Sequence, residues 1–252
     1  MSGSTIDFAI DTVEGDGTSA HFVHTDAVNW VILREGSDLT LVDGGYPGQA
    51  DVVVESIRRI GCRPEDIRGA LLTHAHVDHI GGLAKLLGRY DFPVYADPVE
   101  VGHARRDYLQ QASPLGIARI AAAPRVLRWL AAVTPLGVLS RAGIADTQPF
   151  PEPLDLPGRP APVAAHGHTD GHSAYLVADG AVLVSGDALV SGHPISKING
   201  AQCIPTVFQH DESAARASVE SFTQLDADTL FPGHGRRLDG GVAAAARDAL
   251  AR

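Results

Sequence analysis

The sequence predicts an α+β protein in which helices cover layered β-sheets. Strands followed by a helix are expected twice along the 252 residues, and a helical insert at about residues 99–147 separates the two halves. Two similar halves that mix strands and helices are typical of sheets packed in layers under helices. No low-complexity linker divides the chain, so we expect residues 1–252 to form a single domain.

Short apolar runs bounded by turn residues define the strands expected in the first half. These runs are residues 27–33, 38–45, 67–74 and 92–97. Residues 49–61 carry apolar side chains at helical spacing, and Gly61 ends this expected helix. A shorter helix is expected at residues 81–90, after a histidine cluster that follows the third strand.

The helical insert is rich in Ala, Leu, Pro and Arg. Pro114, Pro124 and Pro135 are expected to divide it into short helices, because proline disrupts a helix interior. Apolar runs then return, and the strands expected in the second half are residues 161–168, 173–179, 181–190 and 228–235. Helices are expected at residues 211–224, capped by Asp211, and at residues 240–252.

Composition and charge exclude several classes of protein. No apolar run reaches the roughly 18 residues of a membrane helix, so we expect no transmembrane segment. Residues 1–17 lack the basic start and apolar core of a signal peptide, which predicts a cytoplasmic location. The formal net charge of −10 argues against a nucleic-acid partner, because such binding neutralises phosphates with Lys and Arg. Two isolated cysteines, Cys62 and Cys203, predict no disulfide framework.

The stretch THAHVDHIGG, residues 73–82, holds three histidines and an aspartate within six positions. Residues i and i+2 do not face each other on a helix, so His74 and His76 need a loop at a strand end to share one ion. Asp78 and His79 can then turn toward a second point nearby. Imidazole and carboxylate are groups that Zn²⁺ or a similar transition ion prefers. Four polar groups this close together predict a common metal partner.

Further candidate ligands occur where later apolar runs meet glycine-rich loops. AHGHTDGHSAY offers His166, His168 and His172, VLVSGDALV offers Asp187, and LFPGHG offers His234. Glycine beside each of them permits tight turns and close approach of the backbone. The repeated order of strand, glycine and polar residue predicts that these side chains gather at one place.

Taken in order, HAHVDH, GHTDGH, SGD and PGHG resemble the motifs of the metallo-β-lactamase-fold superfamily of metallohydrolases. The resemblance covers positions 74 to 234 and implies a four-layer αββα sandwich with metals at one edge. It implies two divalent metal ions, with zinc expected and iron or manganese as alternatives. The implied ligands are His74, His76 and His168 for the first ion, and Asp78, His79 and His234 for the second, with Asp187 as the bridge. Asp43 in LVDGG resembles the family's aspartate that orients a ligand histidine.

The sequence has no GxSxG nucleophile motif, so we expect water to be the nucleophile. Metal binding lowers the pKa of water toward about 7. A hydroxide shared by the two ions would attack a carbonyl group, and Asp78 is the expected catalytic residue that orients this hydroxide or carries its proton. No covalent enzyme intermediate is expected.

The substrate class follows from the resemblance. Asp187 in SGD resembles the glyoxalase II, lactonase and phosphodiesterase branches, because true β-lactamases usually have Cys or Ser there. Because only 18 residues follow His234 in this sequence, we do not expect the helical domain that glyoxalase II normally adds. Lactonases commonly have a tyrosine where this chain has Val190, and Tyr175 is either a substitute or a core residue. We expect hydrolysis of a small ester, lactone or thioester with an apolar portion.

The helical insert has no acidic residue between positions 108 and 145 but four arginines: Arg119, Arg125, Arg128 and Arg141. It could cap the metals, with apolar side chains for an acyl or aromatic group and arginine for an anion. The alternatives are contact with an anionic membrane surface or an ordinary packed insert with snorkelling arginines. His172 and His193 lie near ligand motifs and are candidates for substrate contact.

Two other functions are compatible with metal binding. Persulfide dioxygenases of the superfamily use one iron ion held by two histidines and an aspartate, whereas the retained Asp78, His79 and His234 favour two ions here. The second alternative is a metal-stabilised binding protein without activity, against which the complete ligand set argues. The sequence predicts no oligomeric state.

Overall fold

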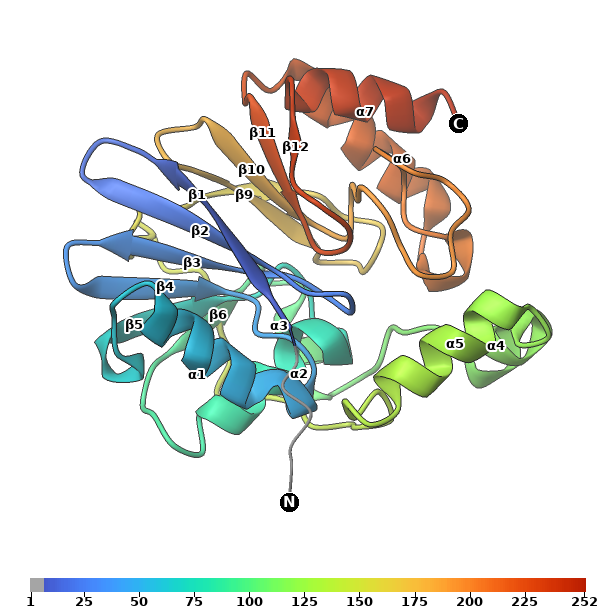
Figure 1. The fold of residues 1–252 in the computed structure, drawn as a ribbon, viewed down its shortest axis with the longest axis horizontal. Helices are drawn as coiled ribbons and strands as arrows, with labels where there is room; N and C mark the ends of the chain where they lie inside the picture. Colours follow the sequence, from blue (N-terminus) through green and yellow to red (C-terminus); the bar gives the residue numbers. More distant parts are fainter. Residues whose placement is uncertain (1–6) are drawn as a thin grey trace.

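Two β-sheets lie face to face in the computed structural model, which describes residues 7–252 (Figure 1). Residues 1–6, which begin the segment predicted not to be a signal peptide, lie outside the described residues. One sheet has seven strands in chain order: β1 (Ala9–Glu14), β2 (Thr18–His24), β3 (Trp30–Glu35), β4 (Asp38–Val42), β5 (Ile67–Leu71), β6 (Val94–Ala96) and β7 (Gln148–Pro149). Its strands are antiparallel from β1 to β4 and parallel from β4 to β7.

The other sheet has five strands in the order β12-β11-β10-β9-β8. These strands are β8 (Ala161–Ala164), β9 (Ser173–Val177), β10 (Val182–Gly186), β11 (Thr229–Pro232) and β12 (Leu238–Asp239). Only β10 and β11 run parallel, and the other neighbouring pairs are antiparallel.

Helices cover the outer faces of both sheets (Figure 1). Those on the seven-stranded sheet are α1 (Ala50–Arg59), α2 (Val77–Leu86) and α3 (Val101–Arg105), and those on the five-stranded sheet are α6 (Glu212–Ser221) and α7 (Val242–Leu250). The helices α4 (Pro114–Ile120) and α5 (Pro124–Val133) project from the side of the sandwich. Short 3-10 helices occur at Pro47–Gln49, Pro64–Asp66, Thr206–Phe208 and Phe222–Gln224. This αββα order confirms the predicted fold class.

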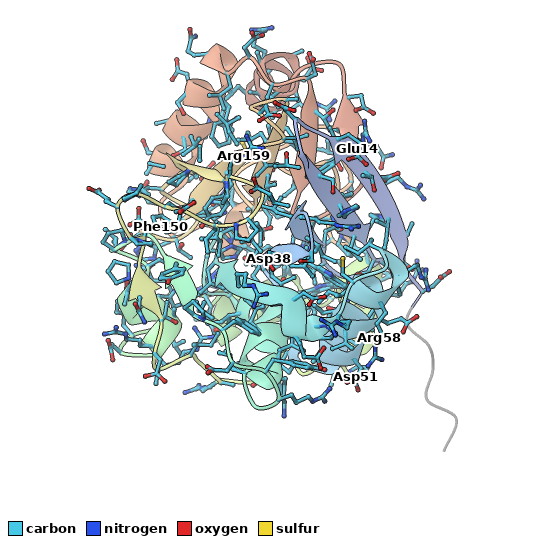
Figure 2. All side chains as sticks on the ribbon, turned by 90° about the vertical axis from the view of Figure 1, so that its left-hand side faces the viewer. Glu14, Asp38, Asp51, Arg58, Phe150 and Arg159 are labelled. Atoms are coloured by element: carbon cyan, nitrogen blue, oxygen red, sulfur yellow. The ribbon has the colours of Figure 1, made fainter. Side chains whose placement is uncertain are left out.

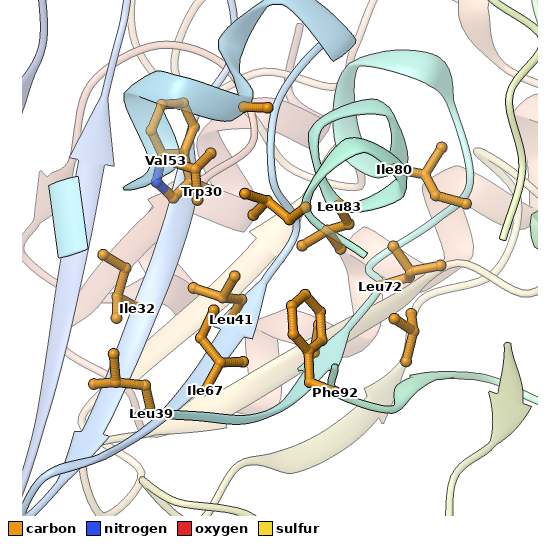
Figure 3. Close-up of a cluster of buried hydrophobic side chains, with 14 of the residues drawn as sticks. Trp30, Ile32, Leu39, Leu41, Val53, Ile67, Leu72, Ile80, Leu83 and Phe92 are labelled. Atoms are coloured by element: carbon orange, nitrogen blue, oxygen red, sulfur yellow. The ribbon is translucent and has the colours of Figure 1, made fainter. Parts of the chain in front are cut away.

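Alternation along the strands divides the core between the layers. Leu39 and Leu41 of β4 pack under the helices, together with Val53 of α1 and Leu83 of α2 (Figure 3). The polar face of α1 points outward, where Asp51 and Arg58 are exposed (Figure 2). Because the side chains of an amphipathic helix repeat about every 3.6 residues, α1 packs its apolar face on the sheet and exposes its polar face to solvent.

Between the sheets, the opposite faces of the same strands meet. Phe22 of β2 stacks on Phe231 of β11, with ring centroids 4.8 Å apart. Tyr175 of β9 is fully buried in this layer and donates its hydroxyl hydrogen to the Leu72 carbonyl. Of the two interpretations of Tyr175, the structure therefore supports the core residue.

Two local expectations need correction. Helix α2 begins at Val77, within the histidine cluster, rather than near Gly81. His76 is extended and precedes the helix, and Asp78 lies in the first turn, where an acidic side chain is favoured. The strands β1, β2, β7 and β12 were not separately predicted; β1 is a largely polar edge strand, and β7 and β12 have only two residues each. None of the helices in residues 7–252 is both long enough and apolar enough to span a membrane.

Candidate metal centre

Three of the predicted ligand histidines form a first cluster, consisting of His74, His76 and His168. Nε2 of His168 lies 3.2 Å from Nε2 of His74 and 3.0 Å from Nδ1 of His76. His74 and His76 follow β5, and His168 lies in the loop between β8 and β9. Loops that follow strands of both sheets thus bring the three ring nitrogens close together.

Asp78, His79 and His234 form a second cluster. Nε2 of His234 lies 3.4 Å from Oδ2 of Asp78, and Nε2 of His79 lies 3.9 Å from the same oxygen. Asp78 and His79 occupy the first turn of α2, and His234 follows β11. The first turn of α2 therefore places Asp78 and His79 beside His234, while the His79 ring also lies 4.1 Å, centroid to centroid, from that of His74 in the first cluster.

Asp187 lies between the two clusters, just after β10. Its Oδ2 lies 3.6 Å from Nε2 of His168 and 3.4 Å from Nε2 of His234, and its Oδ1 lies 3.5 Å from Nε2 of His79. A Cβ atom on Gly233 would lie 2.3 Å from Oδ1 of Asp187, so this close approach requires glycine. One carboxylate thus contacts both clusters.

The other ring nitrogen of each histidine is held by a hydrogen bond. His79 donates from Nδ1 to Asp43 at 2.8 Å, and His74 donates to the Thr73 hydroxyl, which itself donates to Asp43. The remaining acceptors are the Gln110 carbonyl for His76, the Gln209 side chain for His168 and the Ala27 carbonyl for His234. Such partners fix the tautomer, so that the free lone pairs point into the centre. Asp43 lies where the sequence predicted, with a left-handed φ of 63°.

Burial and neighbouring charges give the histidines of the two clusters different pKa values. Burial lowers the pKa of His76 to about 4 and holds the pKa of His74 and of His168 well below its ordinary value. Burial also opposes a charge on His234, but Asp187 and Asp78 outweigh it and raise its pKa to about 9. The first cluster is therefore neutral, whereas the second cluster holds a proton near its carboxylates.

Two buried atoms in the centre lack a hydrogen-bond partner among residues 7–252: Nε2 of His79 and Oδ1 of Asp187. A buried polar atom without a partner is costly. Nitrogen and carboxylate donors that converge within 4.8 Å of one another suit divalent cations. The residues present therefore fit divalent metal ions.

A cavity of about 450 Å³ opens onto the centre, with His76, Asp78, His168, Asp187 and His234 in its wall. The helical insert supplies much of the remaining wall through apolar side chains: Ile117, Ala118, Ala121, Trp129, Leu130, Val138 and Leu139. None of the four insert arginines lines this cavity, and Arg125 and Arg128 line a separate one on the other side of α5. The insert thus covers the centre, but the predicted anion contact by arginine lacks support.

Two polar side chains besides the predicted ligands stand close to the centre in this cavity. His193 was predicted to be near it, and its ring centroid lies 4.9 Å from that of His234. Tyr46 was not predicted, although it follows Asp43 in the loop DGGYPG. His172 does not line the cavity; its Nε2 accepts a hydrogen bond from the Asp187 backbone. The sequence pattern pointed to ligand motifs and gave no signal for Tyr46.

The sequence model described as the Metallo-beta-lactamase superfamily matches residues 25–234, which include both clusters and Asp187. The chain belongs to this superfamily. Its members among known proteins include metallo-hydrolases, and this protein is a metal-dependent hydrolase, as predicted.

Curated relatives of this metallo-β-lactamase superfamily protein agree. It is 27% identical over 222 residues to the "Probable metallo-hydrolase YflN" of Bacillus subtilis (strain 168), covering 82% of this chain and 78% of the relative. It is 31% identical over 166 residues to the "Hydroxyacylglutathione hydrolase" of Alkalilimnicola ehrlichii (strain ATCC BAA-1101 / DSM 17681 / MLHE-1), covering 66% of this chain and 49% of that relative.

Solved structures agree with the fold. The chain matches "Rm3 metallo-beta-lactamase" with a TM-score of 0.63 at 19% identity, covering 97% of this chain and 91% of the other. It matches "AidC, a Dizinc Quorum-Quenching Lactonase, in complex with a product N-hexnoyl-L-homoserine" with a TM-score of 0.60 at 16% identity, covering 90% of each chain. Likeness at this level of identity shows the common fold alone.

Proposed function

We propose that this protein is a dinuclear, zinc-type hydrolase of a small, uncharged ester, lactone or thioester with an apolar portion. The observation that supports it most strongly is the position of Asp187, whose two carboxylate oxygens approach histidines of both clusters. Two separate sets of donors joined by one carboxylate suit a pair of ions better than a single one.

The first ion would be held by the first cluster, the second ion by the second cluster, and Asp187 would contact both. Bound divalent ions supply a water of lowered pKa and a Lewis acid for a carbonyl oxygen. The histidines of the first cluster are already neutral because burial lowers their pKa, so their lone pairs are ready for a cation.

Asp78 and Tyr46 are the residues proposed to act on the substrate. Burial would raise the pKa of Asp78, but attraction to His79 and His234 outweighs it and leaves the pKa below its ordinary value. Asp78 is therefore an ionised carboxylate that can orient a water by accepting a hydrogen bond from it. Burial, with Asp78 and Asp187 nearby, raises the pKa of Tyr46 well above 10. Its hydroxyl therefore stays protonated and can donate a hydrogen bond to a substrate oxygen.

The cavity wall supports an uncharged, apolar substrate. Its apolar side chains come mainly from the insert, with Val77, Ile204 and Phe208, and no lysine or arginine is among its lining residues. An anionic group would find no lysine or arginine there, whereas an acyl chain would bury apolar area. The proposal includes both lactones and thioesters because similar proteins are named a lactonase and a hydroxyacylglutathione hydrolase.

Metal analysis followed by an activity panel tests this proposal. We expect about two zinc ions, or a mixture with manganese or iron, per dialysed chain, and turnover of acyl lactones or thioesters. About one iron ion per chain without hydrolysis would favour the persulfide-dioxygenase alternative instead. Bound metal with no turnover of any substrate would favour the non-catalytic alternative. A cytoplasmic location and the absence of a nucleic-acid partner stay predictions.

A further inference from the structure

A buried glutamate lies beside the first cluster but outside the proposed ligand set. Glu100 directly precedes α3, and its side chain has no exposed surface. Burial would raise the pKa of its carboxyl group, but hydrogen bonds from His103, Thr169 and Ala75 leave that pKa below its ordinary value. A buried carboxylate is costly unless its hydrogen bonds are satisfied, so these contacts indicate what it does.

The carboxylate of Glu100 joins the two loops that carry the first cluster. Its Oε1 accepts from the backbone N–H of Ala75 at 2.7 Å, and Ala75 lies between His74 and His76. Its Oε2 accepts from the Thr169 hydroxyl at 2.8 Å and from the Gly171 N–H at 3.1 Å, just after His168. One side chain thus fixes the distance between the two loops.

A second path leads from Glu100 to the outer nitrogen of His76. His103 donates from Nδ1 to Glu100 at 2.8 Å and accepts from the Gln110 N–H at Nε2, at 3.3 Å. The carbonyl of Gln110 accepts from Nε2 of His76. In this path His103 donates from Nδ1 and accepts at Nε2, and His76 donates from Nε2, so the tautomers of both histidines are determined.

The residue after the C-terminal end of α3 also binds Ala75. Arg106 follows α3 with a left-handed φ of 70°, and its Nη1 donates to the Ala75 carbonyl at 2.8 Å. The Ala75 residue is therefore held at its N–H by Glu100 and at its carbonyl by Arg106. A Cβ atom on Gly171 would lie 2.3 Å from the backbone nitrogen of Glu100, so only glycine allows the second loop to come this close.

We infer that Glu100 is a positioning residue that sets the spacing of His74, His76 and His168 and thereby the affinity of the first ion. The inference rests on the proposed metal binding. Helix α3 was predicted to be part of the helical insert. By this inference it supports the metal centre and does not cover the cavity. The effect should be larger at the first cluster, because Glu100 binds Ala75, between His74 and His76, and Thr169, directly after His168. Asp78 and His79 instead lie in the first turn of α2, and none of the hydrogen bonds of Glu100 reaches them or His234.

Binding of Co²⁺ to single-cluster proteins tests the inference. In a His234→Ala background the first cluster is intact, and in a His76→Ala background the second cluster is intact. We expect Glu100→Gln to weaken Co²⁺ binding about 10–100-fold in the first background, with altered visible absorption bands, and to weaken it much less in the second background. Glu35→Gln is the matched control, since Glu35 is half-exposed and binds Gly158 and Arg159.

The outcomes separate this inference from the proposed function. If the parent protein binds no Co²⁺, the proposed function itself fails. If the parent binds two ions but Glu100→Gln leaves the affinity and spectrum of the first cluster unchanged, only the inference is overturned. Equal weakening in both backgrounds would also overturn it, because that indicates a general loss of structure.

A milder variant pair covers the case in which Glu100→Gln does not fold. Thr169→Val removes one of the donors to Glu100, and Thr169→Ser retains it. We expect weaker Co²⁺ binding by the first cluster in Thr169→Val and near-parental binding in Thr169→Ser. Identical binding by both variants would contradict the inference.

Discussion

At the scale of single residues, the centre depends on hydrogen bonds made away from it. Asp43 accepts from His79 directly and from His74 through Thr73, so one carboxylate orients a histidine of each cluster. This pairing explains why a loop aspartate is held at a left-handed φ. Tyr46, three residues later, lies in the cavity wall and is not among the proposed metal ligands.

Replacement of Tyr46 by phenylalanine should lower turnover without loss of metal. The hydroxyl beside Asp78 would no longer donate to the substrate oxygen, and the loss of one such donor reduces kcat by about 10²-fold. Steady-state kinetics on the best substrate of the panel, with metal content measured in the same samples, checks this. Unchanged kcat in Tyr46→Phe would remove Tyr46 from the mechanism.

Uptake of the second ion should release protons at neutral pH. The raised pKa of His234, about 9, keeps the metal-free ring protonated at pH 7, and a metal ion binds only the neutral ring. Affinity should therefore increase as the pH rises toward 9 and level off above it. Calorimetry in buffers of different ionisation enthalpy should show release of about one to two protons per second ion at pH 7. No release at pH 7 would contradict the assignment.

At the scale of elements, the part of the insert that covers the centre, residues 114–138, is attached to the sandwich through one side of α5. We call this part the cap. Val126, Trp129 and Val133 are buried against residues that include Val28 and Tyr46. The backbone adds the hydrogen bond from Gly48 N–H to the Leu136 carbonyl at 2.9 Å. The order of this segment should therefore depend strongly on the buried apolar face of α5.

Trp129→Ala should loosen the cap and leave the sheets intact. Removal of a buried tryptophan costs about 3–5 kcal/mol, and Trp129 is 8% exposed. Hydrogen exchange of backbone amides in residues 114–138 should become roughly 10-fold faster or more, with unchanged exchange in β3 and β10. Leu127→Ala is the control on the same helix, because Leu127 is 55% exposed. Equal exchange in both variants would mean that Trp129 does not anchor the cap.

The elements also show what the sequence could and could not predict. His74, His76, Asp78 and His79 are neighbours in the chain, so their grouping was readable, and the motif order supplied His168, Asp187 and His234. Glu100 and Tyr46 belong to no dense local pattern, and their roles arise from contacts between distant segments. Glu100 is 69 residues from Thr169, and only the packing of α3 between two loops brings them together. The start of α2 was misplaced because its first turn carries ligands instead of apolar residues.

At the scale of the whole molecule, the centre joins the two halves of the sandwich. The first half supplies His74, His76, Asp78 and His79, and the second half supplies His168, Asp187 and His234. Bound ions would therefore stabilise the contact between the sheets in addition to each loop.

Metal removal should lower the melting temperature of the entire protein. An ion at 100 times its Kd stabilises the folded state by about 2.7 kcal/mol. For a chain of this size, that free energy corresponds to roughly 5–10 °C in Tm. Differential scanning calorimetry with and without a chelator checks the shift, and readdition of zinc should restore it. The same Tm in both samples would show that the ions do not link the two halves.

The division of ligands between the halves also bears on the synthesis of the protein. A growing chain can collect the four ligands of its first half early, but Asp187 and His234 come from strands made much later. Until β10 and β11 join the sandwich, the first four ligands have no bridging carboxylate and no partner histidine from the second half. Tight metal capture would therefore be a late event of biogenesis, and a stalled or truncated chain would compete poorly for the metal supply of the cell.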